Sequence, residues 1–288
     1  MDLNELRLQI DQIDDQLVTL FTQRMDISAQ IADYKKEHNL PIFVPSREAE
    51  KLQDVTQKAG TGMEVYTSVL YSMLFELSRG YQSKRNATRT ALYTRISESI
   101  EQTPKMMPRN ALIACPTEDN EAIQIVCQRL FGSHTAMPFK NTEGILSAVS
   151  HGMCRFGLLP IDGRMKEVFD QVSTHNLFIV RSYRLAENRH YICLSKELEI
   201  YPGADHSSVR MTLADQPGAL YKVLARLYTL GINIAAIESH PISDQNFQRV
   251  FYFDLQTSVY SEEFVQLICE LDDLCKDFSY LGSYVEVI

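Results

Sequence analysis

An apolar stripe interrupted by one charged residue runs along the start of this chain. Leucine and isoleucine recur at alternating steps of three and four, at positions 3, 6, 10, 13, 17 and 20. This spacing is typical of one long amphipathic helix, here ending near Lys36, whose stripe packs against partner helices. The stripe continues at Arg24, Ile27 and Ile31, so a guanidinium stands at a position that should face the interior. Because a buried charge needs a partner, Arg24 predicts an anionic group or ligand within a helical domain.

Two further helices complete this first domain. Two prolines in HNLPIFVPS break the first helix, and a second helical pattern runs from Arg47 to about Gln57. Apolar residues from Val65 to Leu77 then fall at helical spacing and predict a third helix. We therefore predict an all-α domain of three helices over residues 1–90, followed by a polar, proline-punctuated linker over 91–109.

The rest of the chain predicts two smaller domains with different orders of strands and helices. Strands and helices alternate over residues 110–203, which is typical of a small α/β domain, with strands expected at 111–115, 156–161 and 177–185. Residues 204–288 show the order strand, helix, strand, strand, helix, strand, which is the ferredoxin-like α+β pattern. Its last strand is expected at 284–288. The fold class predicted is therefore multidomain.

Composition excludes several classes of partner. The formal net charge of -9 argues against nucleic-acid binding, which needs basic residues to replace counterions on the phosphates. The six cysteines form no CxxC pair and lie near no histidine at zinc-finger spacing, so we expect no metal, no cofactor and no disulfide framework. No uncharged apolar run reaches about 18 residues, and the acidic N-terminus does not resemble a signal peptide, so we expect no membrane partner and a cytoplasmic location.

Polar residues gather around Arg24 at helical spacing. Lys35 follows eleven residues later, and eleven steps of about 100° return to nearly the same helix face, about 16 Å along the axis. Ser78 and Gln82 are four apart and share one face of the third helix. Taken singly, such residues are typical of salt-bridged or solvated positions. Together they predict a cationic pocket without the paired nucleophile and base of a hydrolase.

The full spacing resembles the all-helical chorismate mutases over the whole first domain. The residues that carry the resemblance are Arg7, Arg24, Lys35, Arg47, Glu48, Ser78 and Gln82. By this resemblance, Arg24 and an Arg7 from a second subunit would clamp the two carboxylates of chorismate, with help from Ser78. Seventeen residues separate the two arginines, which is about 25 Å along a helix, so one chain cannot readily close the site. The resemblance therefore implies an intertwined homodimer or a higher homo-oligomer.

The resemblance also implies a reaction that depends on placement. Chorismate rearranges to prephenate within one molecule, so catalysis can come from holding a reactive conformer and placing donors at the ether oxygen. Lys35 and Gln82 would be those donors. Glu48 would accept a hydrogen bond from the ring hydroxyl, and Arg47 would support that side. The family often has an acidic residue four positions before the glutamate, where this chain has Val44.

The C-terminal residues resemble the phenylalanine-sensing ACT domain of prephenate dehydratases. Two motifs, DQPGAL and ESHP, carry the resemblance. The effector residues that it implies are Asp215, Gln216, Pro217, Gly218, Ala219, Leu220, Asn233, Glu238 and Ser239. The turn would place backbone donors and a helix N-terminus beside an amino-acid carboxylate. His240 stands where the family usually has arginine, and a purely structural ferredoxin-like dimerisation module is the alternative interpretation.

The middle segment resembles one lobe of a prephenate dehydratase with its second lobe missing. The motif expected as Thr-Arg-Phe is Arg189-His190-Tyr191, and the strand end expected as Pro-Ile-Glu-Asn is Pro160-Ile161-Asp162-Gly163. Ala114-Cys115-Pro116-Thr117 stands where the family has a glycine-rich loop. We therefore predict a degenerate lobe without dehydratase activity, in which His190 is a strand residue.

Three hypotheses follow from these resemblances. The leading one is a chorismate mutase of phenylalanine biosynthesis, modulated by phenylalanine at the ACT domain. The second is a bifunctional chorismate mutase/prephenate dehydratase. The third is a non-catalytic phenylalanine-binding regulator that uses the helical domain for assembly.

Overall fold

The computed structural model describes residues 2–85, 90–118, 120–161, 165–186, 189–243, 248–275 and 277–287. No helix in those ranges is both long and apolar enough to cross a membrane. The chain divides into two compact units, the first made of residues 1–88 and 224–229 and the second of residues 89–223 and 230–288. Each is described by itself.

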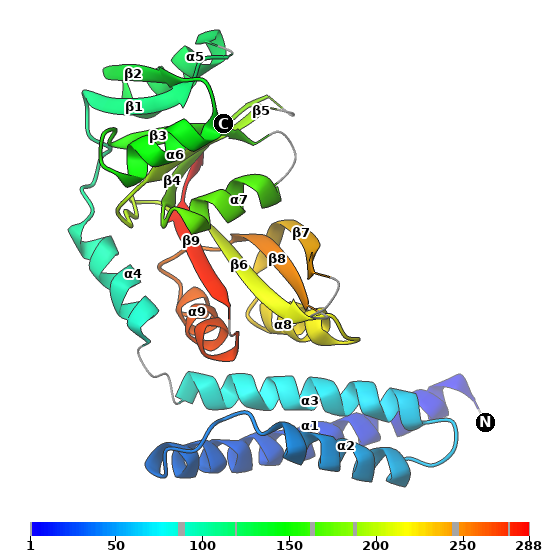
Figure 1. Cartoon of the computed structure of the whole chain (residues 1–288). Coiled ribbons are helices and arrows are strands. Elements are labelled where there is room, and N and C mark those ends of the chain that lie inside the picture. The colour runs from blue at the N-terminus through cyan, green and yellow to red at the C-terminus, as the bar shows by residue number, and fades with distance from the viewer. Residues whose placement is uncertain are drawn as a thin grey trace. The chain divides into compact units, whose positions relative to one another are not determined.

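Three helices form the N-terminal part, as the sequence predicts (Figure 1). They are α1 (Leu3–Glu37), α2 (Pro45–Lys58) and α3 (Glu64–Arg85). A capping box of Asp2 and Glu5 begins α1, and Pro45 begins α2 at a position where a missing N–H costs little. Both α1 and α2 pack against α3. In the described residues, the side chains along the first half of α1 remain exposed.

The apolar stripe of α1 is exposed along its first half. The exposed fractions of Ile10, Leu17 and Leu20 are 57%, 53% and 61%. The expectation that Ile27 and Ile31 face the interior is wrong within one chain, because both are exposed, and the buried residues are instead Ser28, Ala29 and Ala32. Small side chains let α3 approach α1 closely at this point, and the larger isoleucines lie on another face.

A helix replaces most of the predicted linker. Residues Ala91–Gln102 form α4, whose first turn is capped by the Thr90 hydroxyl accepting from the Tyr93 amide. Ile96 is buried, and the Ser99 hydroxyl donates to the Leu198 carbonyl at 2.6 Å. The segment is therefore an amphipathic helix that packs within the second unit, although its sequence is largely polar.

The α/β lobe is built on a mixed sheet with helices on both faces. Its elements are β1 (Ala111–Pro116), α5 (Asn120–Phe131), β2 (His134–Phe139), α6 (Thr142–Ser150), β3 (Phe156–Ile161), α7 (Met165–Thr174), β4 (Phe178–Ala186) and β5 (Arg189–Ser195). Strands β1, β2 and β3 are parallel, and β5 runs antiparallel between β3 and β4. The strands predicted at 111–115, 156–161 and 177–185 are present, whereas the sequence interpretation missed β2.

Alternation along β1 explains the two-sided core. Ile113 and Cys115 pack into a cluster with α5, and Ala114 packs into another with α6 and α7. The second cluster also contains Val250 and Tyr252 from the C-terminal sheet. The lobe and the C-terminal domain therefore share one core.

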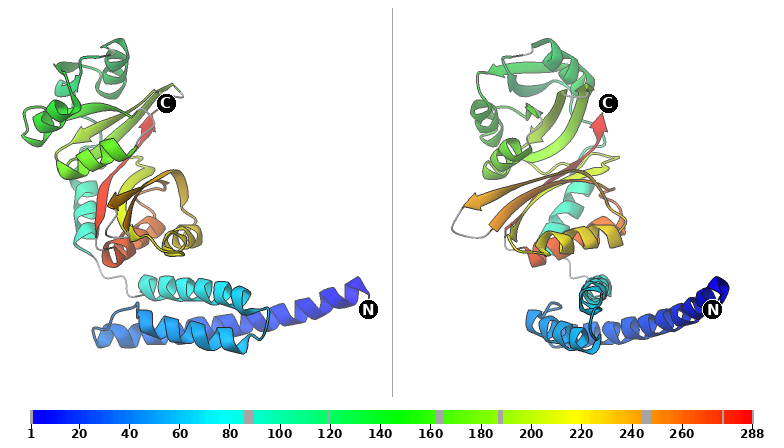
Figure 2. Two further views of the ribbon diagram at one scale, coloured as in Figure 1. Left: turned by 45° about the vertical axis from the view of Figure 1, so that its right-hand side comes forward. Right: turned by 90° about the vertical axis from the view of Figure 1, so that its right-hand side faces the viewer.

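The C-terminal domain has the predicted βαββαβ order. Its elements are β6 (His206–Ala214), α8 (Ala219–Thr229), β7 (Asn233–Ser243), β8 (Gln248–Gln256), α9 (Glu262–Leu274) and β9 (Phe278–Tyr284). The antiparallel sheet has the order β7-β8-β6-β9. Figure 2 shows α9 along one face of this sheet, and helix α7 of the lobe contacts β7, β8 and β9.

The last strand lies earlier than the sequence predicts and then leaves its sheet. Strand β9 ends at Tyr284, and β10 (Glu286–Val287) pairs in parallel with β4. The amide of Ser182 donates to the Val285 carbonyl at 3.2 Å, within the six-stranded order β10-β4-β5-β3-β1-β2. The predicted strand at 284–288 is therefore corrected: residue 284 ends β9, and residues 286–287 pair with the lobe instead of the ferredoxin-like sheet.

Gly282 is required where β9 approaches β4. Its φ is +134°, and a Cβ atom there would lie 2.2 Å from the Ile179 carbonyl oxygen. We expect Gly282→Ala to lower the free energy of unfolding by about 3 kcal/mol, because backbone must shift to relieve the clash. Gly132→Ala is the matched control: its φ is +70° with open space around it, and it should lose only about 1 kcal/mol. Equal losses in urea denaturation would contradict this reading.

Candidate functional site

Arg24 is held between α1 and α3 by neutral groups. Its Nη1 atom donates to the Leu74 carbonyl at 3.2 Å and to the Ser78 hydroxyl, and its guanidinium lies 6.0 Å from the centre of the Phe75 ring. Burial lowers the pKa of Arg24, and the nearby Tyr71 and Glu48 oppose that effect. Among the described residues, its Nε and Nη2 atoms have no protein partner, so donors remain for a ligand.

Lys35 lies on α1 eleven residues after Arg24, and its side chain is likewise half-buried. Its Nζ atom donates to the Ile42 carbonyl at 2.6 Å, which fixes the ammonium beside the loop that precedes α2. Burial lowers the pKa of Lys35, and the charge of Glu48 opposes it. The two cations of α1 therefore share one carboxylate as their electrostatic neighbour.

Gln82 completes this group from α3. Its Nε2 atom donates to the Ser28 hydroxyl at 2.8 Å, and both side chains are buried. Its Oε1 atom is buried and has no hydrogen-bond partner in the described structure. A buried polar atom in this state is rare in folded proteins and marks a position where a ligand group can bind.

Glu48 is held by Arg79, a residue that the sequence analysis did not predict for the site. Arg79 on α3 pairs with both Glu48 and Glu76, and its guanidinium lies 4.9 Å from the centre of the Phe43 ring. The spacing of three between Glu76 and Arg79 was a weak signal, because such pairs are common on exposed helix faces. Here the pair is largely buried and positions the one carboxylate predicted for the site.

Two predicted residues lie outside this group. Arg47 is exposed and forms an ion pair with Glu50 at 3.6 Å, so this chain does not bring it to the other predicted residues. Arg7 is exposed on the first half of α1, as expected for a residue that would serve a second subunit. Val44 is the residue before α2 and offers no side-chain cap.

We refer to Arg24, Lys35, Glu48, Ser78 and Gln82 as the helical site.

The turn predicted for effector binding is present. Strand β6 ends at Ala214, residues 215–218 are exposed, and Gly218 has a φ of +87°, which favours glycine. Helix α8 begins at Ala219, so its first amides follow the turn directly. Asn233 begins β7 and donates to the side chain of Gln256 at 2.9 Å.

The ESHP motif contacts the lobe. The Glu238 carboxylate accepts from the backbone amides of Met165 and Lys166, at 2.7 and 3.4 Å, and so caps the N-terminus of α7. Burial would raise the pKa of Glu238, but His240 and these two amides outweigh it and lower that pKa. Ser239 accepts from Arg249 at 3.2 Å. The two halves of the predicted effector site thus differ: the turn is open, whereas Glu238 already has partners.

His190 lies on β5 of the lobe, and its side chain is half-buried. Its Nε2 atom contacts the Ser182 hydroxyl and lies 3.5 Å from Glu286, and burial lowers its pKa. The same nitrogen atom of His190 lies near both Ser182 and Glu286. Ser182 is fully buried, so its hydroxyl is not accessible to a substrate as a nucleophile. The side chain of Arg189, and residues Asp162 and Gly163, lie outside the described structure. Residues 114–116 end β1, and the Thr117 amide donates to the Phe139 carbonyl.

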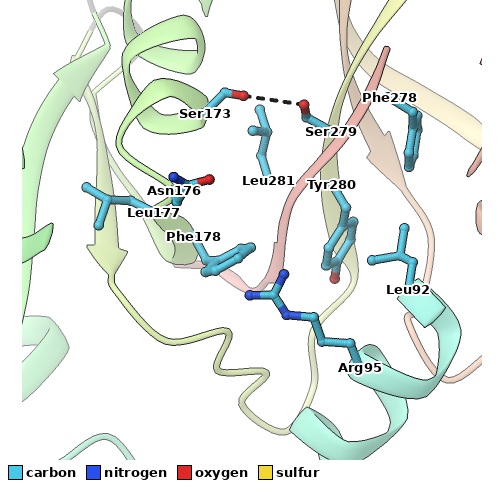
Figure 3. A pocket seen from close by; sticks show the side chains of 10 residues that line it. All are labelled: Leu92, Arg95, Ser173, Asn176, Leu177, Phe178, Phe278, Ser279, Tyr280 and Leu281. Atoms are coloured by element: carbon cyan, nitrogen blue, oxygen red, sulfur yellow. Dashed lines mark hydrogen bonds between the residues drawn. The ribbon is translucent and has the colours of Figure 1, made fainter. Parts of the chain in front are cut away.

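A separate cavity of about 220 Å³ lies in the second unit (Figure 3). Arg95 of α4 lies over the Phe178 ring at 4.6 Å, and Tyr280 and Leu281 of β9 form another wall. None of the predicted site residues lines it. Within the described ranges, no three histidine, cysteine, aspartate or glutamate side chains gather as a metal site requires.

Comparisons with known proteins agree with this division of the chain. Residues 6–83 match the family model of type II chorismate mutases, and residues 207–259 match that of ACT domains. The bifunctional chorismate mutase/prephenate dehydratase of Aquifex aeolicus is 23% identical over 360 residues, covering 100% of this chain and 99% of the relative. That alignment is longer than the 288 residues of this chain, so the relative has segments that this chain lacks.

Two solved structures share the fold of the second unit. Prephenate dehydratase from Streptococcus mutans is similar with a TM-score of 0.52 and 21% identity, over 62% of this chain and 100% of that one. Prephenate dehydratase from Arthrobacter aurescens, solved with L-Phe, has a TM-score of 0.52 and 16% identity, over 60% of this chain and 89% of that one. At these identities the likeness is one of fold.

These observations define the chain as a protein with a type II chorismate mutase domain and an ACT domain. Its domain layout is similar to that of the bifunctional chorismate mutase/prephenate dehydratases, and this agrees with the family that the sequence resemblance predicts.

Proposed function

We propose that this protein converts chorismate to prephenate at the helical site. The observation that carries the proposal is that residues far apart in sequence converge within one helical unit: Arg24 contacts Ser78, Gln82 contacts Ser28 on α1, and Glu48 is the electrostatic neighbour of both cations. Such a pocket offers donors and one carboxylate. It suits an anionic substrate that must be placed in one conformation.

The mechanism follows from placement and charge. Arg24 would bind a carboxylate through donors that have no protein partner, and Glu48 would accept from the ring hydroxyl. As the carbon-oxygen bond breaks and the carbon-carbon bond forms, negative charge grows on the ether oxygen. Lys35 and Gln82 would donate to that oxygen in a pocket of low dielectric, where such bonds are strongest.

A second copy of the chain would complete the site. The exposed stripe on the first half of α1 is apolar over several turns, which supports burial against another copy. Arg7 lies on this exposed half, about 25 Å from Arg24 along the helix. In an intertwined dimer the partner's α1 would bring its own Arg7 to the substrate.

Replacing either proposed donor tests the mutase function. We expect Lys35→Ala and Gln82→Ala each to lower kcat for chorismate loss, followed by absorbance, by about 10²- to 10³-fold, because each donor stabilises charge that develops in the transition state. Lys36→Ala, an exposed neighbour on the same helix, is the matched control and should keep the wild-type rate. Unchanged rates in both donor variants would exclude the helical site as the place of reaction.

We also propose that the lobe has no dehydratase activity. Support comes from the burial of Ser182 beside His190 and from the single sheet of the lobe in the described residues. Purified protein given prephenate should form no phenylpyruvate above the rate without enzyme. Measurable formation, lost in His190→Ala but retained in Lys35→Ala, would favour the bifunctional alternative.

The open turn at residues 215–218 supports phenylalanine as an effector. Its backbone and the N-terminus of α8 offer donors to an amino-acid carboxylate, and the sequence resemblance adds Asn233 at the start of β7. Calorimetric titration with phenylalanine should give heat in the wild type and about tenfold weaker binding in Asn233→Ala, with exposed Glu263→Gln on α9 as control. One lost hydrogen bond to a charged group accounts for such a factor.

Chorismate turnover measured with and without phenylalanine then separates the remaining alternatives. A change in rate would support allosteric modulation, whereas heat without any turnover would favour the non-catalytic regulator. Binding without an effect on rate would mean that phenylalanine has equal affinity for the active and inactive states.

A further inference from the structure

Ser28 and Gln82 form a buried polar pair that the proposed reaction does not by itself explain. Their exposed fractions are 5% and 8%, and the hydrogen bond between Nε2 and Oγ is 2.8 Å. Ser28 lies on α1 one turn after Arg24, so it adjoins the helical site without belonging to the residues predicted for it. Burying a hydroxyl in a helix interface costs free energy, and alanine would fill the same space among these small residues without that cost.

The Ser28 hydroxyl differs from other hydroxyls on these helices. Ser72 and Ser78 each donate to the backbone carbonyl four residues earlier, at 2.8 and 2.7 Å. Within residues 2–85, the bond to Gln82 is the one described for the Ser28 side chain. Its proton is therefore not committed to the backbone of its own helix, and the hydroxyl can either accept or donate.

Gln82 presents two faces to this hydroxyl. In the present orientation its Nε2 donates to Ser28, and its buried Oε1 is without a partner in the described structure. A half-turn of the amide exchanges the two atoms. Oε1 would then accept from the Ser28 hydroxyl, and the NH2 group would occupy the place where Oε1 now lies. The second orientation becomes favourable when an acceptor oxygen enters the pocket.

We propose that Ser28 is a positioning residue that turns the Gln82 amide so that its NH2 group donates to the ether oxygen of the substrate. This inference rests on the proposed mutase function. The serine hydroxyl anchors the amide oxygen, and a carbonyl that accepts a hydrogen bond makes its own NH2 a stronger donor. The stronger donor stabilises mainly the transition state, because the ether oxygen gains negative charge there.

Removing the hydroxyl tests the assignment. Ser28→Ala should lower kcat for chorismate about tenfold, the loss of one hydrogen bond of ordinary strength, while KM changes less than about twofold. Ser28→Thr keeps a hydroxyl and should recover most of kcat. Ser72→Ala, which removes a helix hydroxyl bonded to its own backbone, is the matched control and should keep the wild-type kcat.

A double-mutant cycle with Gln82→Ala separates positioning from a structural effect. If Ser28 acts only through Gln82, then Ser28→Ala should have no further effect on kcat in the Gln82→Ala background. The inference is overturned if Ser28→Ala keeps the wild-type kcat, or if its loss is the same in both backgrounds. Urea denaturation of each variant identifies any loss due to unfolding, and Ser28→Thr provides the test in that event.

The same experiment distinguishes failure of the inference from failure of the function. A wild-type protein without chorismate turnover refutes the mutase function and, with it, the role of Ser28. A wild type that turns over chorismate, is disabled by Gln82→Ala and is unaffected by Ser28→Ala refutes only the positioning role.

Discussion

A guanidinium held in a helix interface constrains the first unit more than any other group. Arg24 has lost part of its hydration, and a carbonyl and a hydroxyl of α3 replace it. This requirement fixes the register of α1 against α3. The register in turn brings small residues of α1 beneath α3 and places Ser28 opposite Gln82. Pairing this partly buried charge therefore also brings residues of the helical site on α1 and α3 together.

Local periodicity explains which parts of this site the sequence could predict. Helix phase relates Arg24 to Lys35 and Ser78 to Gln82 without knowledge of the tertiary fold. The role of Arg79 could not be predicted in this way, because its partner Glu48 comes from another helix, across a loop whose path periodicity does not encode. For the same reason the burial of Ile27 and Ile31 was predicted wrongly: a stripe states that a face is apolar, not which chain covers it.

The domain boundaries show a second limit of sequence reasoning. Order along the chain separates an α/β segment from a ferredoxin-like one, and both patterns are correct. Packing joins them: Tyr252 contributes to the core of the lobe, Glu238 caps α7, and Asp170 of that helix accepts from Arg210 at 3.1 Å. These contacts depend on side chains meeting across sheets, which no short sequence pattern encodes. The amphipathic α4 was missed because its flanks are polar.

The path of β10 has a consequence for biosynthesis. The lobe is translated before the C-terminal domain, yet its edge strand β4 receives its last neighbour from residues 286–287. An unpaired strand edge readily pairs with other chains, so the edge of the nascent lobe stays exposed until the C-terminal domain has folded and β10 pairs with β4. A chaperone that shields strand edges during this interval would therefore favour correct folding of the lobe.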